Sequence, residues 1–134
     1  MVNVQKLKLL YLMKMLYTKT SASQGLTMSA ILKELEACGI KAERKSVYRD
    51  IESLREFGLD VRVLQRAPAE YALVSRDLDT DDMRDIACAL QSSAELTQRR
   101  ADALVRGLKL ITPECDRAKL DGRMQVAGRI KVQG

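Results

Sequence analysis

Apolar residues recur every three or four positions in the first part of the chain. In residues 3–17 they lie on two sides of a helical wheel, which predicts a helix that packs against two neighbours. One side carries Leu9, Leu12, Met13 and Leu16, and the other carries Val4, Leu7, Tyr11 and Met15. Two later segments each carry one apolar stripe at helical spacing: Ile31, Leu32 and Leu35 in the first, and Val47, Ile51 and Leu54 in the second. The pattern therefore predicts three consecutive helices, and the second and third each bury a single face.

Local signals set the ends of these helices. Thr27 is suited to cap the second helix, because its hydroxyl can accept a hydrogen bond from the first turn. Gly39 and Gly58 suit the left-handed position that follows a helix, so they are expected to end the second and the third. The third helix should span residues 44–57, or begin one residue earlier.

The period changes after the third helix. Residues 61–64 and 70–74 are β-prone and flank a turn at residues 67–69 (Ala-Pro-Ala). Short bounded runs of this kind predict a β-hairpin. Two strands alone are marginally stable, so this hairpin is expected to pack on the three helices.

Two further amphipathic helices are predicted beyond the hairpin. Asp79 or Thr80 can cap the first of them and Thr97 the second. They are expected to pair as a helical hairpin. The remaining residues predict a short helix up to Leu120, and then a short strand or arm over residues 124–132.

The order of these elements predicts a fold class. Helix, helix, four-residue turn, helix and β-hairpin is the order of a winged helix-turn-helix. We therefore expect a mainly α fold with a small β-hairpin wing, in which residues 1–76 form a winged helix-turn-helix DNA-binding domain. Residues 77–134 are expected to add a helical hairpin and tail, used for dimerisation or as a linker.

Charge favours a polyanionic partner for the N-terminal part. The chain has 134 residues, with 23 Lys and Arg against 18 Asp and Glu, and a net charge of +5. Residues 6–33 hold five lysines and no acidic residue. A basic segment of this kind is compatible with nucleic-acid binding, although net charge alone does not establish it.

The residue types argue against catalysis. The chain has no histidine, and its three cysteines form no C-x-x-C pair, so no zinc site is expected. It also lacks a Gly-rich phosphate loop and a G-x-S-x-G motif. We expect neither an enzyme nor a bound metal or cofactor, and we interpret Asp79, Asp81 and Asp82 as helix-start residues rather than metal ligands.

The cellular location is expected to be the cytoplasm, where cysteines stay reduced. Lys6 and Lys8 before an apolar stretch imitate a secretory signal, but Lys14 interrupts that stretch. We therefore interpret it as a helix of the folded protein, and we expect no membrane-spanning segment.

The third helix is the expected recognition helix. In helix-turn-helix proteins its N-terminal residues meet base edges in the major groove. Five polar residues stand at this N-terminus: Arg44, Lys45, Ser46, Tyr48 and Arg49. We expect Lys45 and Arg49 to contact base edges or phosphates. The alternative is that this charged face is only solvated.

Three other residues are candidate DNA contacts. Arg62 and Arg66 flank the turn of the predicted wing and could bind phosphate or the minor groove, or could serve only solubility. Thr27 could offer a backbone amide to a phosphate besides capping its helix, or could act as a cap alone.

Residues 44–51 (RKSVYRDI), followed by Leu54 and Gly58, resemble a known family. They are similar to the recognition helix of the DeoR-like winged helices at the front of bacterial WYL-domain regulators. The resemblance covers residues 6–76 and extends loosely over 79–108. It implies a bacterial transcription factor, generally dimeric, in which Ser46, Tyr48 and Arg49 approach DNA and Asp50 braces the helix.

The chain departs from that family in two ways. Relatives often have Ser at the N-cap of the recognition helix, where this chain has Glu43, whose charge would repel phosphates. The chain also has no Trp and ends before a WYL domain could begin, so we expect either a natural short form or an excised N-terminal half, with no small-molecule effector inferable. The competing interpretation is a winged helix that contacts a partner protein without binding DNA.

Overall fold

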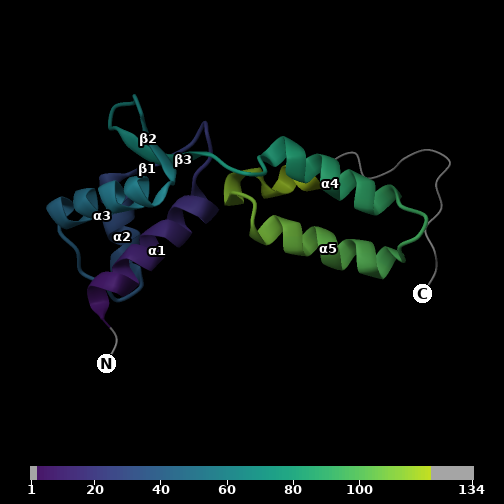
Figure 1. Ribbon diagram of the computed structural model, residues 1–134, viewed down its shortest axis with the longest axis horizontal. Helices are drawn as coiled ribbons and strands as arrows, with labels where there is room; N and C mark the ends of the chain where they lie inside the picture. Colours follow the sequence, from purple (N-terminus) through teal and green to yellow (C-terminus); the bar gives the residue numbers. More distant parts are fainter. Residues whose placement is uncertain (1–2, 122–134) are drawn as a thin grey trace. The chain divides into compact units, whose positions relative to one another are not determined.

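The computed structural model describes residues 3–121, and the chain divides into two compact units, residues 1–76 and 77–134 (Figure 1). The fold is mainly helical with a small three-stranded antiparallel sheet. The elements of the first unit are α1 (Val4–Lys19), β1 (Leu26–Thr27), α2 (Met28–Ala37), α3 (Arg44–Phe57), β2 (Asp60–Leu64) and β3 (Glu70–Ser75). Those of the second are α4 (Thr80–Ser92), α5 (Gln98–Leu110) and the 3-10 helix η1 (Glu114–Leu120).

The predicted ends of α2 and α3 are confirmed, whereas α1 extends two residues beyond the predicted end at Tyr17. The Thr27 hydroxyl accepts a hydrogen bond from the backbone amide of Ala30 at 3.1 Å and so caps α2. Gly39 and Gly58 follow α2 and α3 with φ angles of 82° and 118°, which non-glycine residues rarely adopt. Local sequence therefore determined where these helices end.

The sheet contains one strand that the sequence did not predict. The expected hairpin forms from β2 and β3, and its turn points away from the three helices (Figure 1). The additional strand, β1, pairs with β3 through Leu26 and Thr27, which gives the order β1-β3-β2. Two residues show no period, so only the pairing reveals this strand. A Cβ on the preceding Gly25 would lie 2.7 Å from the Tyr71 carbonyl oxygen, so the close approach requires glycine.

The core of the first unit lies between the three helices and the sheet. Its fully buried side chains come from every helix and from β3: Leu12, Leu16, Ile31, Leu35, Val47, Ile51 and Leu73. The buried face of α1 also includes Met15 and, unexpectedly, Lys8. It thus differs from both predicted apolar faces of this helix, and Val4 and Leu10 remain exposed.

The second unit has a smaller core. Helices α4 and α5 pack together and enclose Met83, Ala87, Val105 and Leu120, so the predicted helix pair is present. Asp79 caps α4 in a reciprocal capping box with Asp82, and Thr97 caps α5. The expected short helix up to Leu120 is the 3-10 helix η1, whereas the strand or arm expected over 124–132 lies outside the described residues.

Within residues 3–121, no helix combines the length and the apolar character that crossing a bilayer requires.

Candidate nucleic-acid interface

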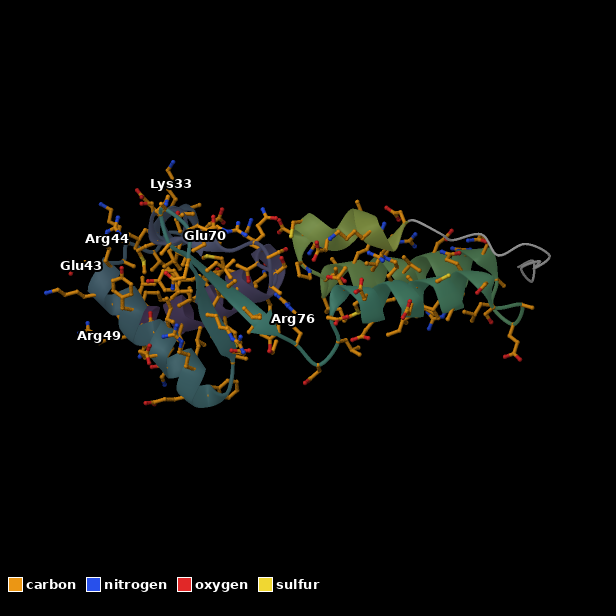
Figure 2. The ribbon with its side chains drawn as sticks, turned by 90° about the horizontal axis from the view of Figure 1, so that it is seen from above. Lys33, Glu43, Arg44, Arg49, Glu70 and Arg76 are labelled. Atoms are coloured by element: carbon orange, nitrogen blue, oxygen red, sulfur yellow. The ribbon has the colours of Figure 1, made fainter. Side chains whose placement is uncertain are left out.

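The N-terminal half of α3 carries a row of exposed cationic side chains. Lys45 and Arg49 lie one helical turn apart and are both exposed, while the opposite side of α3 buries Val47, Ile51 and Leu54. Figure 2 shows Glu43, Arg44 and Arg49 along the N-terminal part of α3, at the outer edge of the first unit. The continuation of the same row toward the C-terminus is acidic, with Glu52 and Glu56 exposed.

Arg44 and Glu43 lie at the start of α3. The Arg44 guanidinium donates a hydrogen bond to the Ser29 hydroxyl on α2 at 3.4 Å, which is a long contact between exposed groups. Glu43 occupies the N-cap position, but its side chain makes no capping hydrogen bond. The amides of the first turn therefore lack the side-chain acceptor that Thr27 provides in α2.

Tyr48 joins α3 to the sheet. Its side chain is 43% exposed, and its ring centroid lies 6.2 Å from that of Tyr71 on β3 in a tilted arrangement. Burial raises the pKa of the Tyr71 phenol, and the hydrogen bond with Tyr48 raises it further. Tyr48 thus packs against Tyr71 on one side, and the rest of its side chain is exposed to a ligand.

Ser46 does not share the exposure of its neighbours. It is half-buried, and its hydroxyl accepts a hydrogen bond from the ammonium group of Lys8 on α1. Lys8 is 2% exposed and forms an ion pair with Asp50, with 3.0 Å between Nζ and Oδ2. Ser46 therefore faces α1, and the sequence-based expectation that it reaches outward needs correction.

The role of Lys8 was missed in the sequence. Counted with the other lysines of residues 6–33, it suggested a solvated basic surface. Its position four residues before Leu12 and seven before Met15 places it on the buried row of α1, and this spacing is the one signal that could have located it. The basic surface of the first unit thus excludes Lys8.

Arg62 lies on β2 and has a partner within the hairpin. Its Nε donates to Oδ1 of Asp60 at 2.9 Å, and the Ser75 hydroxyl donates to Oδ2 of the same carboxylate at 2.5 Å. The hydrogen bond from Arg62 is the main reason why the pKa of Asp60 lies below its usual value. The same bond raises the pKa of Arg62. Arg62 is nevertheless largely exposed.

Arg66 connects the hairpin turn to the loop before β1. Its guanidinium donates to the Ser23 carbonyl at 2.6 Å and to the Glu70 carboxylate at 3.3 Å. Glu70 in turn accepts from the amide of Gly25 at 3.1 Å. Arg66 therefore has a structural role. Glu70 lies only four residues away, but the Ser23 carbonyl lies 43 residues earlier, and this distant partner could not be predicted from the sequence.

Charge is divided unequally between the units. Residues 1–76 hold 13 Lys and Arg against 8 Asp and Glu, a net charge of +5, whereas residues 77–134 hold 10 of each. The whole net charge of the chain thus belongs to the unit that carries α3. Within the described residues, no group of three or more acidic or cysteine side chains is placed to hold a metal ion.

Comparisons with protein-family models, with curated proteins and with solved structures found no match to this chain. The resemblance of residues 44–58 to DeoR-like recognition helices therefore stays a prediction.

Proposed function

We propose that this protein is a sequence-specific, double-stranded DNA-binding transcriptional regulator, and that its first unit is a winged helix-turn-helix. The observation that carries the proposal is the exposed cationic row of Lys45 and Arg49 on the N-terminal half of α3, with Arg44 and Tyr48 beside it. An outward basic row at the start of a helix is what major-groove recognition requires.

The topology supports this proposal. The order α1-β1-α2-α3-β2-β3, with a sheet ordered β1-β3-β2, supplies a helix pair, α2 and α3, and a hairpin beside it. In this arrangement α3 is the recognition helix and β2–β3 is the wing.

The chemistry of each side chain suits a different part of a duplex. The Arg49 guanidinium can donate two parallel hydrogen bonds to a guanine edge or to a phosphate. Lys45 offers a point charge suited to phosphate. The positive end of the α3 dipole adds attraction for phosphate, against which the charge of Glu43 acts.

The wing is expected to contribute less than α3. Arg62 and Arg66 already donate to Asp60, Ser23 and Glu70. A guanidinium has five N–H donors, so each arginine can still bind phosphate, but part of its charge is compensated. The Thr27 hydroxyl oxygen accepts the capping hydrogen bond from Ala30, so its expected role is mainly that of a helix cap.

A duplex-binding titration tests the function. Duplexes are selected from a random-sequence library by the wild-type chain, and the affinity for a selected duplex is measured between 50 and 200 mM salt. Over this range a protein with several phosphate contacts is expected to lose affinity by about 10³-fold or more. Arg49→Ala should weaken binding to the selected duplex by about tenfold, the loss expected for one base contact. The matched control is Arg99→Ala, which removes an exposed arginine from α5 and should change nothing.

The competing function is contact with a partner protein through the same face of α3. It predicts no selected sequence, no steep dependence on salt and no difference between Arg49→Ala and Arg99→Ala in duplex binding. Such a result would reject the proposed function.

A further inference from the structure

The contact between α1 and α3 contains a buried charge that the proposed function leaves unexplained. Lys8 is 2% exposed, and its ammonium group contacts both Ser46 and Asp50 of α3. Within the described residues, Oδ2 of Asp50 has no hydrogen-bond partner, so its contact with Lys8 is an ion pair held by charge. The Asp50 side chain is 18% exposed.

Stability alone does not account for Lys8. It occupies the buried row of α1 together with Leu12 and Met15, where an apolar side chain would be expected. Removing an ammonium and a carboxylate from water is costly, and replacing such a pair by apolar residues is often neutral or stabilising. Buried polar pairs are best attested as devices that fix the register between two elements.

The two partners of Lys8 are placed to fix α3 in this way. Ser46 and Asp50 lie four residues apart, so they are neighbours on one side of the helix. Lys45 and Arg49 directly precede them and form the adjacent, exposed row. One ammonium group thus holds α3 at two points beside the row that is proposed to meet DNA.

Small changes in the orientation of α3 would affect recognition of a DNA sequence. A helix with its side chains has a radius of about 5–6 Å, so a rotation of about 20° moves a side-chain end by about 2 Å. A binding site made of hydrogen-bonding groups works only if those groups lie within about 0.5 Å of their required positions. Apolar contacts through Val47, Ile51 and Leu54 have no direction, whereas a slip of α3 against Lys8 would leave a buried charge without its partner.

We infer that Lys8 is a positioning residue, which orients α3 through Ser46 and Asp50 so that Lys45 and Arg49 meet a specific DNA sequence. This inference rests on the proposed function. Lys8 touches no DNA, so its charge should matter for sequence discrimination and not for attraction to phosphate.

The test measures discrimination directly. Affinity is determined for a duplex selected by the wild-type chain and for an unrelated duplex of the same length, each over a range of salt. Lys8→Met should reduce the ratio of the two affinities by about tenfold, the size of one bidentate base contact. The slope against salt should stay within about half a unit of the wild-type slope, because no phosphate contact is lost. Lys14→Met, which removes an exposed lysine of α1, should leave the ratio unchanged.

A second variant guards against simple unfolding. Lys8→Met alone leaves the buried Oδ2 of Asp50 without its counter-charge, so the double variant Lys8→Met, Asp50→Asn removes both charges together. Folding is checked by circular dichroism. The double variant should be folded and should lose discrimination to the same extent as Lys8→Met, because both lack the same anchor. A folded double variant with wild-type discrimination would overturn the inference.

An NMR measurement separates this inference from the proposed function. The contact between the Tyr48 and Tyr71 rings reports the orientation of α3 without DNA. It should weaken in Lys8→Met and in the double variant and persist in Lys14→Met. A wild-type chain that binds no duplex rejects the proposed function, whereas an unchanged ring contact in both Lys8 variants rejects the positioning role.

Discussion

Thr20 illustrates how a single side chain joins two elements of the first unit. Its buried hydroxyl donates to the Leu16 carbonyl at 2.6 Å and accepts from the amide of Leu73 at 2.9 Å. Arg76 donates to the carbonyls of Leu16, Tyr17 and Thr20. The C-terminal carbonyls of α1, which a helix leaves without partners, are thus paired by side chains.

Replacing Thr20 tests the value of its hydroxyl. Thr20→Val keeps the shape of the side chain but leaves the buried amide of Leu73 without an acceptor, which should lower the free energy of unfolding by about 1–3 kcal/mol. Urea denaturation measures the loss. Thr18→Val is the control, because the Thr18 hydroxyl donates to the exposed carbonyl of Lys14, and its effect should be much smaller.

Asp60 provides a test of pH dependence. Its pKa is lowered, first by the hydrogen bond from Arg62 and then by that from Ser75. A lowered folded-state pKa stabilises the fold above the unfolded carboxyl pKa, and this contribution is lost as the pH falls through the folded value. Carbon NMR titration should find the Asp60 pKa below that of an ordinary aspartate and returned upward in Arg62→Ala. An unchanged value would contradict the pairing.

At the scale of elements, the two ends of α3 are built differently. Gly58 ends the helix in the left-handed conformation, and the amides of Gly58 and Leu59 bond back to the last turn. The start has Glu43 at the N-cap without a side-chain hydrogen bond. The end that is proposed to meet DNA is therefore the less well capped end, and it carries a carboxylate.

Glu43→Ser should improve both stability and binding. A serine at this position can accept a hydrogen bond from the first turn, which should add up to about 1 kcal/mol to the free energy of unfolding. Loss of the carboxylate should also strengthen binding to duplex at low salt. Glu43→Gln separates the effects, since it removes the charge without supplying a good cap. Weaker binding by both variants would contradict the expectation that the Glu43 carboxylate repels DNA phosphates.

At the scale of the whole molecule, each unit has a core of its own. The buried apolar cluster of the first unit runs from Leu12 to Leu73, and that of the second from Met83 to Leu120. The second cluster has four buried members, and Leu110 and Ile111 beside it remain exposed. Homodimer formation stays a prediction from the sequence; sedimentation velocity measures it, and a monomeric mass at tens of micromolar would contradict it.

The separate cores predict that residues 1–76 fold alone. This fragment keeps every member of the first cluster and also Arg76, so it should unfold cooperatively in urea. It also keeps the entire net charge of +5. The affinity of the fragment for duplex should therefore depend on salt as steeply as that of the full chain. A fragment 77–134 should be far less stable, because its buried cluster is small. A disordered 1–76 fragment would show that the units depend on each other.

Several features of the site could be predicted from local sequence. The stripe of Val47, Ile51 and Leu54 determines which side of α3 is buried, and so also which side presents Lys45 and Arg49. The half-buried position of Ser46 was not predicted, because Ser46 lies at the border of that stripe, where a helical wheel does not distinguish buried from exposed positions. The partners of Arg62 and Arg66 were only partly hidden: Asp60 and Glu70 lie two and four residues away and could have been found by spacing, whereas the Ser23 carbonyl lies in a distant loop.

The sequence by itself determined the helices, their caps and the hairpin, because these follow from side-chain period and from backbone preferences of neighbouring residues. Only the tertiary structure decided the pairing of β1 with β3, the buried face of α1 and the partners of Lys8. Lys8 and Ser46 are 38 positions apart, and Thr20 and Leu73 are 53 apart. Contacts of that range depend on how whole elements pack, and no local pattern of residues encodes them.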